Sequence, residues 1–374
     1  MLYEIHMIKN YPPANLNRDD TGSPKTSYFG GSLRGRISSQ CLKRSWRTSA
    51  LFDSLLGDRG IRSRQLPDLV KDELILRGMS EAMAEIAKEK VTGIGNKDGK
   101  ENEKGITSQT MFFSAHDVSA VANIMIEAAA DKDEKSFKKA KTTDIVKQMK
   151  NVALRPITID IAMFGRMVTS DAFHNVEAAV QTAHAISTHT VNQENDYFTA
   201  MDDLLGAADT GADMVGDTEY NACCYYHYMS IDTDQLEKNL KDSPDAQAHI
   251  AALLPAMVEI MAFSNPSGKQ NSFASHVLPE AMYIEVKNKK VPTSYANAFE
   301  TPVRFGSNAK VLETSVKNLV KEINLIEESY QLEKTHRAWF APRYNNNPEM
   351  LPTGAQSMHN FKDLLTHCET WTSK

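Results

Sequence analysis

The sequence predicts an α+β fold that carries a large helical insertion. Residues 2–9 and the aromatic-rich run 221–231 have the composition of β-strands, and the second resembles an antiparallel strand. Between them, residues 66–92 and 107–130 have the composition and periodicity of helices. Strands interrupted by a block of helices indicate an α+β domain with an insertion. The 374 residues can form one large domain or two to three smaller ones.

The N-terminal elements follow one another closely. After the strand at 2–9, residues 10–35 are rich in Gly, Pro, Asn and Asp and are predicted to form a long loop. Ser38 or Ser39 is a suitable N-cap for the next helix, which we expect to continue to about residue 56. Its apolar positions predict a core-facing stripe of Leu42, Trp46, Ala50 and Leu55.

The remaining elements are predicted from the same patterns. Residues 157–167 have strand character, and 176–191 are ambiguous between helix and strand. The lysine-rich stretch 131–150 is expected to be helical in its second half. Further helices are predicted at 233–240, 245–263, 311–333 and 358–367.

Charge is unevenly distributed along the chain. The formal net charge is −6, yet residues 1–50 hold 8 Lys/Arg against 3 Asp/Glu. Residues 171–220 hold 10 Asp/Glu and no Lys or Arg. This contrast favours a local anionic partner over a protein that binds polyanions with its whole surface.

The helix beginning near Ser38 combines two features of an anion site. Its N-terminus offers backbone N–H groups and hydroxyl donors, and Lys43, Arg44 and Arg47 add positive charge. Further cations lie in the preceding loop, at Arg18, Lys25, Arg34 and Arg36. Charges spread over thirty residues suit a polyanion better than a single phosphate. The alternative is an ordinary amphipathic helix with a solvated charged face.

The acidic segment 196–206 contains two large aromatic residues, Tyr197 and Phe198. One interpretation is a hairpin whose aromatic side chains enter the core. The other is a protruding element whose apolar side chains stack on or separate nucleobases.

Enzyme motifs are mostly unmatched. SNPSGKQ, 264–270, lacks the first Gly and the final Ser/Thr of a phosphate-binding loop. The histidines His174, His184, His189 and His227 have no zinc spacing. Asp19 and Asp20 are acidic residues that a metal-dependent nuclease could use, although a solvated turn explains them as well. We therefore expect no catalytic residue, no metal and no cofactor.

Location is predicted from cysteines and apolar runs. The four cysteines form no CxxC pair and are expected to be reduced thiols of a cytoplasmic protein. No signal peptide is evident, and the longest apolar stretch, 250–263, contains Pro255 and Glu259. We therefore expect no membrane contact.

Several motifs, in order, closely resemble one family, the CasC backbone subunits of type I-E CRISPR surveillance complexes (Cascade). They are IHMIKNYPPANLNRDDTGSPKTSYFGG, RISSQCLKRSWR, GRMVTSDAF, AHAISTHTVNQENDYFTAMDDL and SYANAFE. The resemblance is weak over 60–150 and 310–374. It implies a modified RRM-like (ferredoxin-like) palm, a helical fingers domain and a protruding thumb. Mapped on this chain, the palm comprises 1–59, 156–190 and 221–374, the fingers 60–155 and the thumb 191–220.

The resemblance also implies a function. Family members stack head to tail along CRISPR RNA, hold it for pairing with target DNA, and bind other Cascade subunits. They are not nucleases, although related backbone subunits of other CRISPR types cut RNA with a loop aspartate. That leaves a metal-dependent ribonuclease using Asp19 or Asp20 as the alternative.

Individual roles carry over by position. The RNA-binding residues implied are Arg18, Lys25, Ser38, Gln40, Lys43, Arg44, Arg47, Met167, Phe198 and Thr199. Among these, Met167 resembles a base-packing palm residue, and Phe198 with Thr199 resembles the thumb tip that displaces one nucleotide. The lysine-rich stretch 131–150, with a net charge of +3, is either a solvated helix or a surface that steers target DNA. The DNA-binding residues would be Lys135, Lys138, Lys139 and Lys141, where Lys135 with Lys139 and Lys138 with Lys141 are spaced to share helix faces. The resemblance supports the second interpretation, because the family's fingers carry a lysine helix in the corresponding region.

Overall fold

The computed structural model describes residues 1–96, 99–145, 156–168, 173–200, 214–304, 306 and 309–372. The chain forms two compact units. The sheet unit comprises Met1–Phe52, Gln181–Ile231 and Ala251–Lys374, and the helical unit comprises Asp53–Val180 and Asp232–Ile250. Two separate stretches thus build the helical unit, which extends beyond the expected fingers segment 60–155 to include 53–59, 156–180 and 232–250, all of them expected in the palm.

A mixed sheet organises the sheet unit, and β1 lies in its interior. The strand order is β13-β12-β11-β1-β10-β7-β3-β2, with β6 paired to β10. β1 pairs antiparallel with β11 from Leu2↔Lys287 to Ile8↔Ala281. The strands are β1 Leu2–Asn10, β2 Thr26–Phe29, β3 Ser32–Ile37, β6 Val180–Thr182, β7 Ala185–Ser187, β10 Cys224–Asp232, β11 Ala281–Lys287, β12 Lys334–Phe340 and β13 Gln356–Ser357. The predicted α+β class is confirmed.

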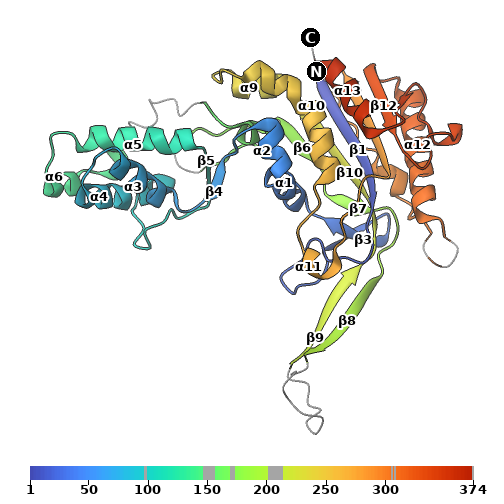
Figure 1. Ribbon diagram of the computed structural model, residues 1–374, viewed down its shortest axis with the longest axis horizontal. Helices are drawn as coiled ribbons and strands as arrows, with labels where there is room; N and C mark the ends of the chain where they lie inside the picture. The colour runs from blue at the N-terminus through green and yellow to red at the C-terminus, as the bar shows by residue number, and fades with distance from the viewer. Residues whose placement is uncertain are drawn as a thin grey trace, which may run out of the picture. The chain divides into compact units, whose positions relative to one another are not determined.

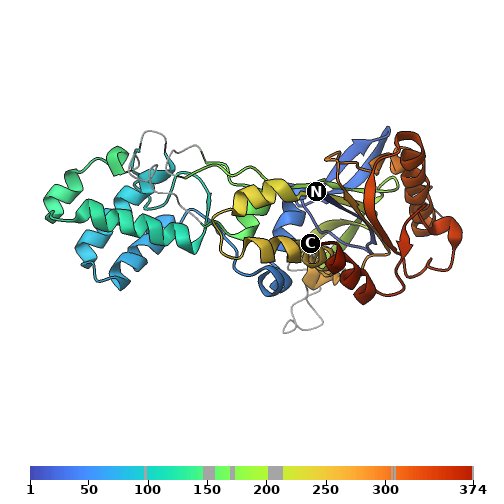
Figure 2. The ribbon, with the colours of Figure 1, turned by 90° about the horizontal axis from the view of Figure 1, so that it is seen from above.

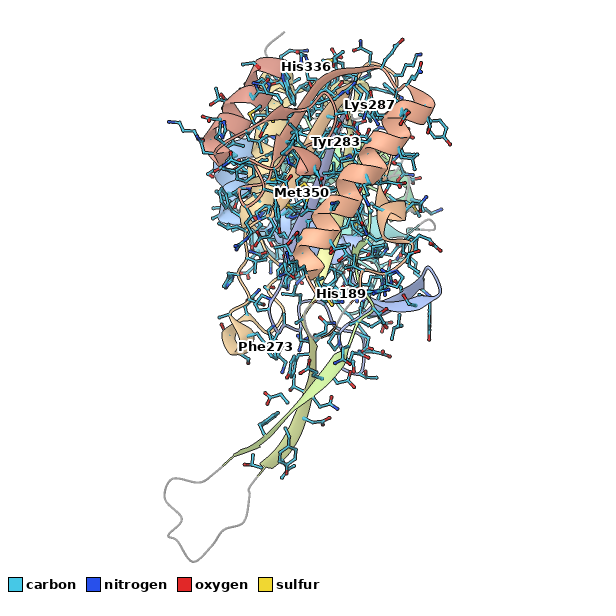
Figure 3. The ribbon with its side chains drawn as sticks, turned by 90° about the vertical axis from the view of Figure 1, so that its right-hand side faces the viewer. His189, Phe273, Tyr283, Lys287, His336 and Met350 are labelled. Carbon is cyan, nitrogen blue, oxygen red and sulfur yellow. The ribbon has the colours of Figure 1, made fainter. Side chains whose placement is uncertain are left out.

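Helices cover both faces of this sheet. α12 packs Val316, Leu319 and Ile323 against sheet residues that include Ile8 and Trp339; Figure 3 shows this helix crossing the sheet. Because side chains alternate along a strand, Lys9 points to the opposite face, where it reaches the residues that follow α10. The helices of this unit are α1 Ser39–Arg47, α10 Ala246–Phe263, α11 Gln270–Phe273, η2 Ala296–Phe299, α12 Val311–Tyr330, η3 Pro348–Met350 and α13 Phe361–Thr372.

A two-stranded hairpin projects from the sheet unit (Figure 1). It consists of β8 Gln193–Ala200 and β9 Met214–Asn221, paired antiparallel from Gln193↔Asn221 to Ala200↔Met214. The part of the expected thumb at 201–213 lies outside the described residues.

The helical unit has its own core. Leu74, Val91, Phe113 and Met125 are buried together, and Ser114 closes the start of α5 with a capping box to Asp117. Figure 2 shows these helices packed side by side. The elements are α2 Ala50–Leu56, β4 Ile61–Ser63, α3 Leu66–Leu76, α4 Glu81–Thr92, η1 Gly93–Gly95, β5 Met111–Phe113, α5 Ala115–Ala129, α6 Glu134–Lys139, α8 Ile159–Phe164 and α9 Thr233–Leu240.

The strand predicted at 157–167 is wrong, because Ile159–Phe164 form helix α8. The alternating pattern favoured a strand, but a tertiary contact decides the conformation. Asp160 is fully buried and accepts hydrogen bonds from the backbone N–H of Gly60 and of Ile161. Gly165, with φ of +79°, then ends the helix.

The single helix predicted from Ser38 to residue 56 is also wrong. α1 ends at Arg47 and α2 starts at Ala50, so the helical phase changes between them. Leu42 and Trp46 are buried as predicted, but Ala50 and Leu55 are exposed. Phe52 and Leu56 take their places in the core.

Two turns and one short strand account for three further differences. The predicted loop 10–35 contains the β2–β3 hairpin, whose two-residue turn uses Gly30 and Gly31 at positive φ. The helix predicted at 66–92 is divided after Leu76, near Gly78 at φ +90°. The helix predicted at 107–130 begins only after strand β5. The strands at 2–9 and 221–231 and the helices at 233–240, 245–263 and 311–333 are confirmed within a few residues.

The structure bears on the two features from which location was predicted, the cysteines and the long apolar stretch. All four cysteines are free thiols, and Cys223, Cys224 and Cys368 are buried. α10 is long and apolar enough to cross a membrane by length and composition alone. That is weak evidence of a membrane span, because a core helix passes the same test, and Leu253, Met257 and Ile260 are buried in this protein.

Candidate nucleic-acid interface

The start of α1 is capped by the serine predicted for it. The Ser38 hydroxyl accepts a hydrogen bond from the Cys41 backbone N–H at 3.3 Å, and Ser38 is buried. Its own N–H donates to Asn17 Oδ1 at 2.8 Å. Ser38 therefore orients the helix, whereas Gln40 and Arg44 are exposed and can meet a ligand.

Cations from the loop and from α1 lie near one another. Lys25 and Arg44 both act on the thiol of Cys41, whose pKa is raised by burial and lowered in part by these two charges. Lys43 and Arg47 are half-buried on the same helix. The structure thus groups residues that lie almost twenty positions apart into one positive surface.

His184 is part of this surface and was missed as a binding residue by the sequence analysis. Its Nδ1 accepts from Arg36 Nη1 at 3.2 Å and from the Ser39 backbone N–H at 3.4 Å. Partial burial lowers the pKa of His184, and Arg36, Lys25 and Lys43 lower it further. The neutral imidazole of His184 therefore accepts a hydrogen bond from Arg36 at the N-terminus of α1 and adds no positive charge that would bind an anion itself.

Two asparagines hold the loop that carries Arg18 and Lys25. Asn15 Nδ2 donates to the backbone oxygen of Glu219 at 2.8 Å and of Gly22 at 3.0 Å. Asn17 receives the Ser38 N–H, and its backbone oxygen accepts from the Lys25 N–H at 2.9 Å. The loop is thereby tied to β9 on one side and to α1 on the other.

Asp19 closes a local turn in the same loop. Its Oδ1 accepts from Thr21 Oγ1 at 2.7 Å and from the backbone N–H groups of Thr21 at 2.9 Å and Ser23 at 3.0 Å. The bond from the Thr21 side chain, followed by the backbone bonds, lowers the pKa of Asp19. Asp19 thus already has a structural role.

A groove of about 950 Å³ opens beside these residues. Arg18 and Arg44 line one part of it, and the loop 264–268 lines another. Gly268 permits the close approach of the two loops, because a Cβ there would lie 2.4 Å from the Leu16 carbonyl oxygen. The groove brings two of the predicted RNA-binding arginines to one concave surface.

The projecting hairpin presents aromatic side chains on an acidic ribbon. Tyr197 is 66% exposed and Phe198 43% exposed, and Thr199 is exposed. The Phe198 ring covers Gly216, where a Cβ would lie 2.6 Å from its Cζ. The described hairpin strands hold four acids and no Lys or Arg: Glu194, Asp196, Asp217 and Glu219.

The base of the hairpin is braced. The rings of Tyr220 and Phe273 are 5.6 Å apart, and the Tyr220 hydroxyl donates to Glu194 Oε2 at 3.1 Å. Figure 3 shows Phe273 on α11 beside the hairpin base. Together with the Asn15 bond to β9, these contacts fix the direction in which the hairpin leaves the sheet.

Met167 lies in the helical unit and is 89% exposed. Its neighbours hold it outward. Arg166 is buried, forms an ion pair with Asp117 at 2.9 Å, and bridges Val176 through two backbone hydrogen bonds. Val168 is buried too, and its N–H donates to Asn175. An unbranched apolar side chain between two anchored residues is suited to pack against a base.

The four predicted DNA-binding lysines are all exposed. Lys135, Lys138 and Lys139 lie on α6, which is anchored by the buried Phe137. The prediction that Lys138 and Lys141 share a helix face is wrong, since α6 ends at Lys139 and Ala140 turns extended. Lys138 also contacts Glu89 at 3.7 Å, an exposed pair of small energetic weight.

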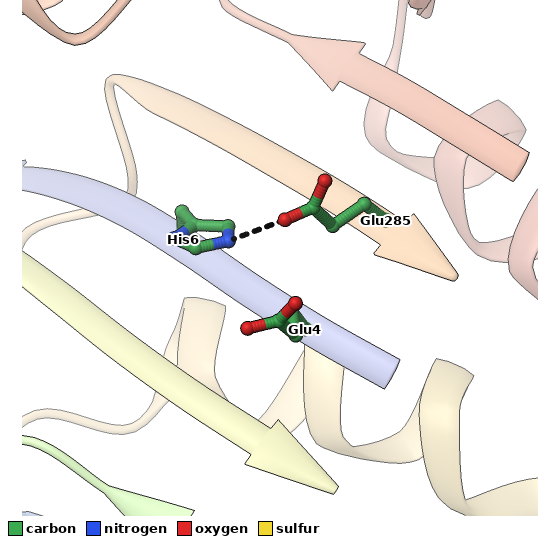
Figure 4. A group of neighbouring side chains, drawn as sticks. All are labelled: Glu4, His6 and Glu285. Carbon is green, nitrogen blue, oxygen red and sulfur yellow. Dashed lines mark hydrogen bonds and ion pairs between the residues drawn. The ribbon is translucent and has the colours of Figure 1, made fainter. Parts of the chain in front are cut away.

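A buried ionic cluster lies between the sheet and α12. Glu4, His6 and Glu285 are close enough to share a metal ion (Figure 4). However, Lys287 forms ion pairs with Glu4 and with Glu285, the latter at 3.2 Å, and Lys334 pairs with Glu285 at 2.8 Å. These ammonium groups already supply the positive charge, so we interpret the cluster as an internal ion network.

Hydroxyl groups complete this network. Tyr226 OH contacts His6 Nδ1 at 2.8 Å, and Tyr295 OH donates to Glu285 at 3.1 Å. Burial alone would raise the pKa of Glu285, but His6, Lys287 and Lys334 outweigh it and hold that pKa well below its usual value. Glu285 is therefore the anionic centre of the network.

Comparison with known proteins identifies relatives of this fold. A solved structure described as "CRISPR RNA-guided surveillance complex, pre-nicking" contains a chain that matches with a TM-score of 0.82 and 26% identity over 100% of both chains. A second, described as "CRISPR RNA-guided surveillance complex", matches in fold with a TM-score of 0.72 and 23% identity, covering 99% of this chain and 100% of the other. No curated protein shows a significant match.

The family model of the CT1975-like proteins matches residues 3–367. Together with the first structural match, it confirms the resemblance to Cascade subunits found in the sequence motifs. The chain therefore belongs to the CT1975-like protein family of Cas proteins.

Proposed function

We propose that this protein is a non-catalytic backbone subunit that binds CRISPR RNA within a surveillance complex. The observation that carries the proposal is the convergence of loop and α1 cations on one groove edge. Arg18 and Arg44 line that groove, and hydrogen bonds of Asn15, Asn17 and Ser38 fix its loop and helix. The RNA-guided complex that contains the related chain supports RNA as the ligand.

The arrangement suits a grip on the RNA backbone. Phosphate contacts position a nucleic acid without reading its sequence, which leaves the bases free to pair with target DNA. The exposed aromatic residues of the hairpin can stack on any base. We further propose that several copies bind one RNA side by side and that other Cascade subunits complete the assembly.

The direct test is to purify the protein with its native nucleic acid. We expect an absorbance ratio at 260 and 280 nm typical of a ribonucleoprotein, and sequencing of the bound RNA should yield CRISPR spacers with repeat-derived ends. Assemblies that carry no nucleic acid and survive nuclease treatment would instead indicate a protein-only scaffold.

The ribonuclease alternative is tested with labelled complementary RNA and Mg²⁺ or Mn²⁺. We expect no site-specific cleavage, since three hydrogen bonds from its own loop occupy Oδ1 of Asp19. Cleavage that disappears with Asp19→Ala or Asp20→Ala would contradict the non-catalytic assignment.

Phe198→Ala is expected to loosen the RNA without changing which guide sequences are bound. Stacking on one aromatic residue contributes about 1–3 kcal/mol and tolerates every base. Chemical probing of bound RNA should show increased reactivity at regularly spaced nucleotides. Val215→Ala, an exposed apolar change on the partner strand, is the matched control and should leave the pattern intact. Equal patterns for both variants would exclude Phe198 from base contact.

Alanine at Lys135, Lys138, Lys139 and Lys141 is expected to slow target DNA association. Charges that contact duplex phosphates without reading bases act mainly on the association rate, and salt screens them. The on-rate of the RNA-loaded complex should fall at low salt and approach the unmodified rate at high salt. An on-rate that is unchanged at low salt would show that these lysines form an ordinary solvated helix face and do not contact target DNA.

A further inference from the structure

Lys9 is a buried cation without an acidic partner. Its side chain on β1 leaves the residue only 1% exposed. Its Nζ donates to the Ser264 carbonyl oxygen at 3.4 Å and to Asn265 Oδ1 at 3.2 Å, and both acceptors are neutral. No carboxylate in the described part of the chain forms an ion pair with it. The buried Lys287 and Lys334, in contrast, each contact two carboxylates.

The groups around Lys9 supply no negative charge. His227 on β10 is buried, and neither ring nitrogen has a hydrogen-bond partner. Burial, and then the charge of Lys9, lower the pKa of His227 to about 3, so its ring is neutral. The Tyr11 hydroxyl donates to Asn265 Oδ1 at 2.7 Å, and burial raises the pKa of Tyr11. Among the described residues, two hydrogen bonds to neutral acceptors, and no carboxylate, offset the cost of burying the charged form of Lys9.

The residues that accept from Lys9 form part of the groove wall. Ser264 and Asn265 both line the 950 Å³ groove that Arg18 and Arg44 line elsewhere. Asn265 is held in place, since its Nδ2 donates to the Val277 carbonyl oxygen at 3.2 Å. Asn265 therefore lies between the buried ammonium group of Lys9 and the groove.

We propose that Lys9 is a positioning residue for an RNA phosphate in this groove, acting through Asn265, and that it takes up a proton when the phosphate binds. The proposal rests on the function proposed above. A phosphate in the groove supplies the missing countercharge, and the protein between them screens the interaction less than water does. Because coupling is reciprocal, the charge on Lys9 must in turn favour the bound phosphate.

The coupling fixes the direction of the pH dependence. Burial lowers the pKa of Lys9 in the free protein to about 7. Phosphate binding raises that pKa, so the contribution to affinity is complete below the free pKa and is lost as pH rises through the bound pKa. His276 lines the groove, and His184, whose pKa is lowered by burial and by nearby cations, lies at the start of α1. Tyr11 and Cys41, whose pKa values are raised by burial, titrate at higher pH.

The experiment compares the full-length protein with Lys9→Met, which keeps the side-chain length and removes the charge. Binding of a fluorescent single-stranded oligouridine RNA is measured between about pH 6 and about pH 9. A shift of one pKa unit corresponds to about tenfold in affinity, so the unmodified protein should weaken by up to about tenfold more than Lys9→Met over this range. Calorimetry in buffers of different ionisation enthalpy should show proton uptake that Lys9→Met lacks.

Two further variants separate the explanations. His276→Gln should retain the pH dependence of RNA binding. That result would show that the groove histidine is not the cause of the pH dependence. Asn265→Asp gives Lys9 a carboxylate inside the protein, so it should reduce both affinity and pH dependence even if Lys9→Met folds poorly. Equal pH profiles for the unmodified protein and Lys9→Met overturn the inference while RNA binding itself stands. Loss of RNA binding by the unmodified protein at every pH overturns the proposed function and this inference with it.

Discussion

Glu285→Ala is expected to lower the free energy of unfolding by about 3–5 kcal/mol, because removing one member of a buried ion network leaves uncompensated charge behind. Lys334 and Lys287 would each lose one of their two carboxylates, and His6 and Tyr295 would lose an acceptor. Urea denaturation monitored by tryptophan fluorescence measures the change as a lower midpoint with an unchanged slope.

Glu333→Ala is the matched control for this prediction. Its ion pair with Lys289 spans 3.6 Å, but both side chains are about two-thirds exposed. An exposed pair contributes at most about 1 kcal/mol, so the midpoint should hardly move. Similar losses for the two variants would show that the buried network contributes no more than a surface pair.

The same carboxylate makes stability depend on pH. Its pKa is lowered from the usual 4.5 in the folded protein. A group of this kind contributes its stability fully above its unfolded pKa and loses it as pH falls through the folded pKa. The free energy of unfolding of the unmodified protein should therefore fall as the pH drops below the usual pKa of 4.5. Glu285→Gln, which starts from a lower stability, should flatten that part of the profile.

Replacing Arg18, Lys43, Arg44 and Arg47 together by alanine is expected to produce the largest loss of RNA affinity. Each lost phosphate contact reduces the slope of log K against log salt by about 0.7 for single strands, or about fivefold in affinity near 0.1 M salt. Four contacts give on the order of 10²–10³-fold. Fluorescence anisotropy with single-stranded RNA at several salt concentrations measures both quantities, and unrelated sequences should weaken equally.

The structure offers a control with the same change in net charge. Alanine at Lys135, Lys138, Lys139 and Lys141 also removes four positive charges. These exposed side chains belong to the helical unit, whereas the groove residues belong to the sheet unit. RNA affinity should then change little. If both quadruple variants weaken RNA equally, binding depends on net charge, and the α1 surface has no special role.

Local chemistry made part of the site predictable. Ser38 caps α1 because the cap requires only a short polar side chain before a helical sequence, and Lys43, Arg44 and Arg47 follow in the same helix. The contacts that hold the surface together are not local. Asn15 reaches Glu219, and His184 reaches Ser39. No periodicity in a single sequence reports such distant pairs.

The burial of charged side chains could not be predicted from the sequence either. Glu4, Lys9 and Lys287 occupy strands whose neighbours are apolar, and a charged residue in such a strand is normally assigned to the solvent face. Only the helices on both sides of the sheet show that these side chains are inside. The helix at Ile159–Phe164 was missed for a similar reason, since a buried hydrogen bond to Asp160 overrides the local strand pattern.

The interior position of β1 constrains how the protein is made. This strand, almost wholly buried, has β10 and β11 as its sheet neighbours, and His6 is separated from Glu285 by 279 residues. At about 5–20 residues per second on the ribosome, β1 waits about 15–60 s for β11. During that interval the edge of β1 that later pairs with β11 is open and available for wrong pairing. We expect the nascent chain to depend on chaperones until its last third has been synthesised, whereas the helical unit can collapse earlier.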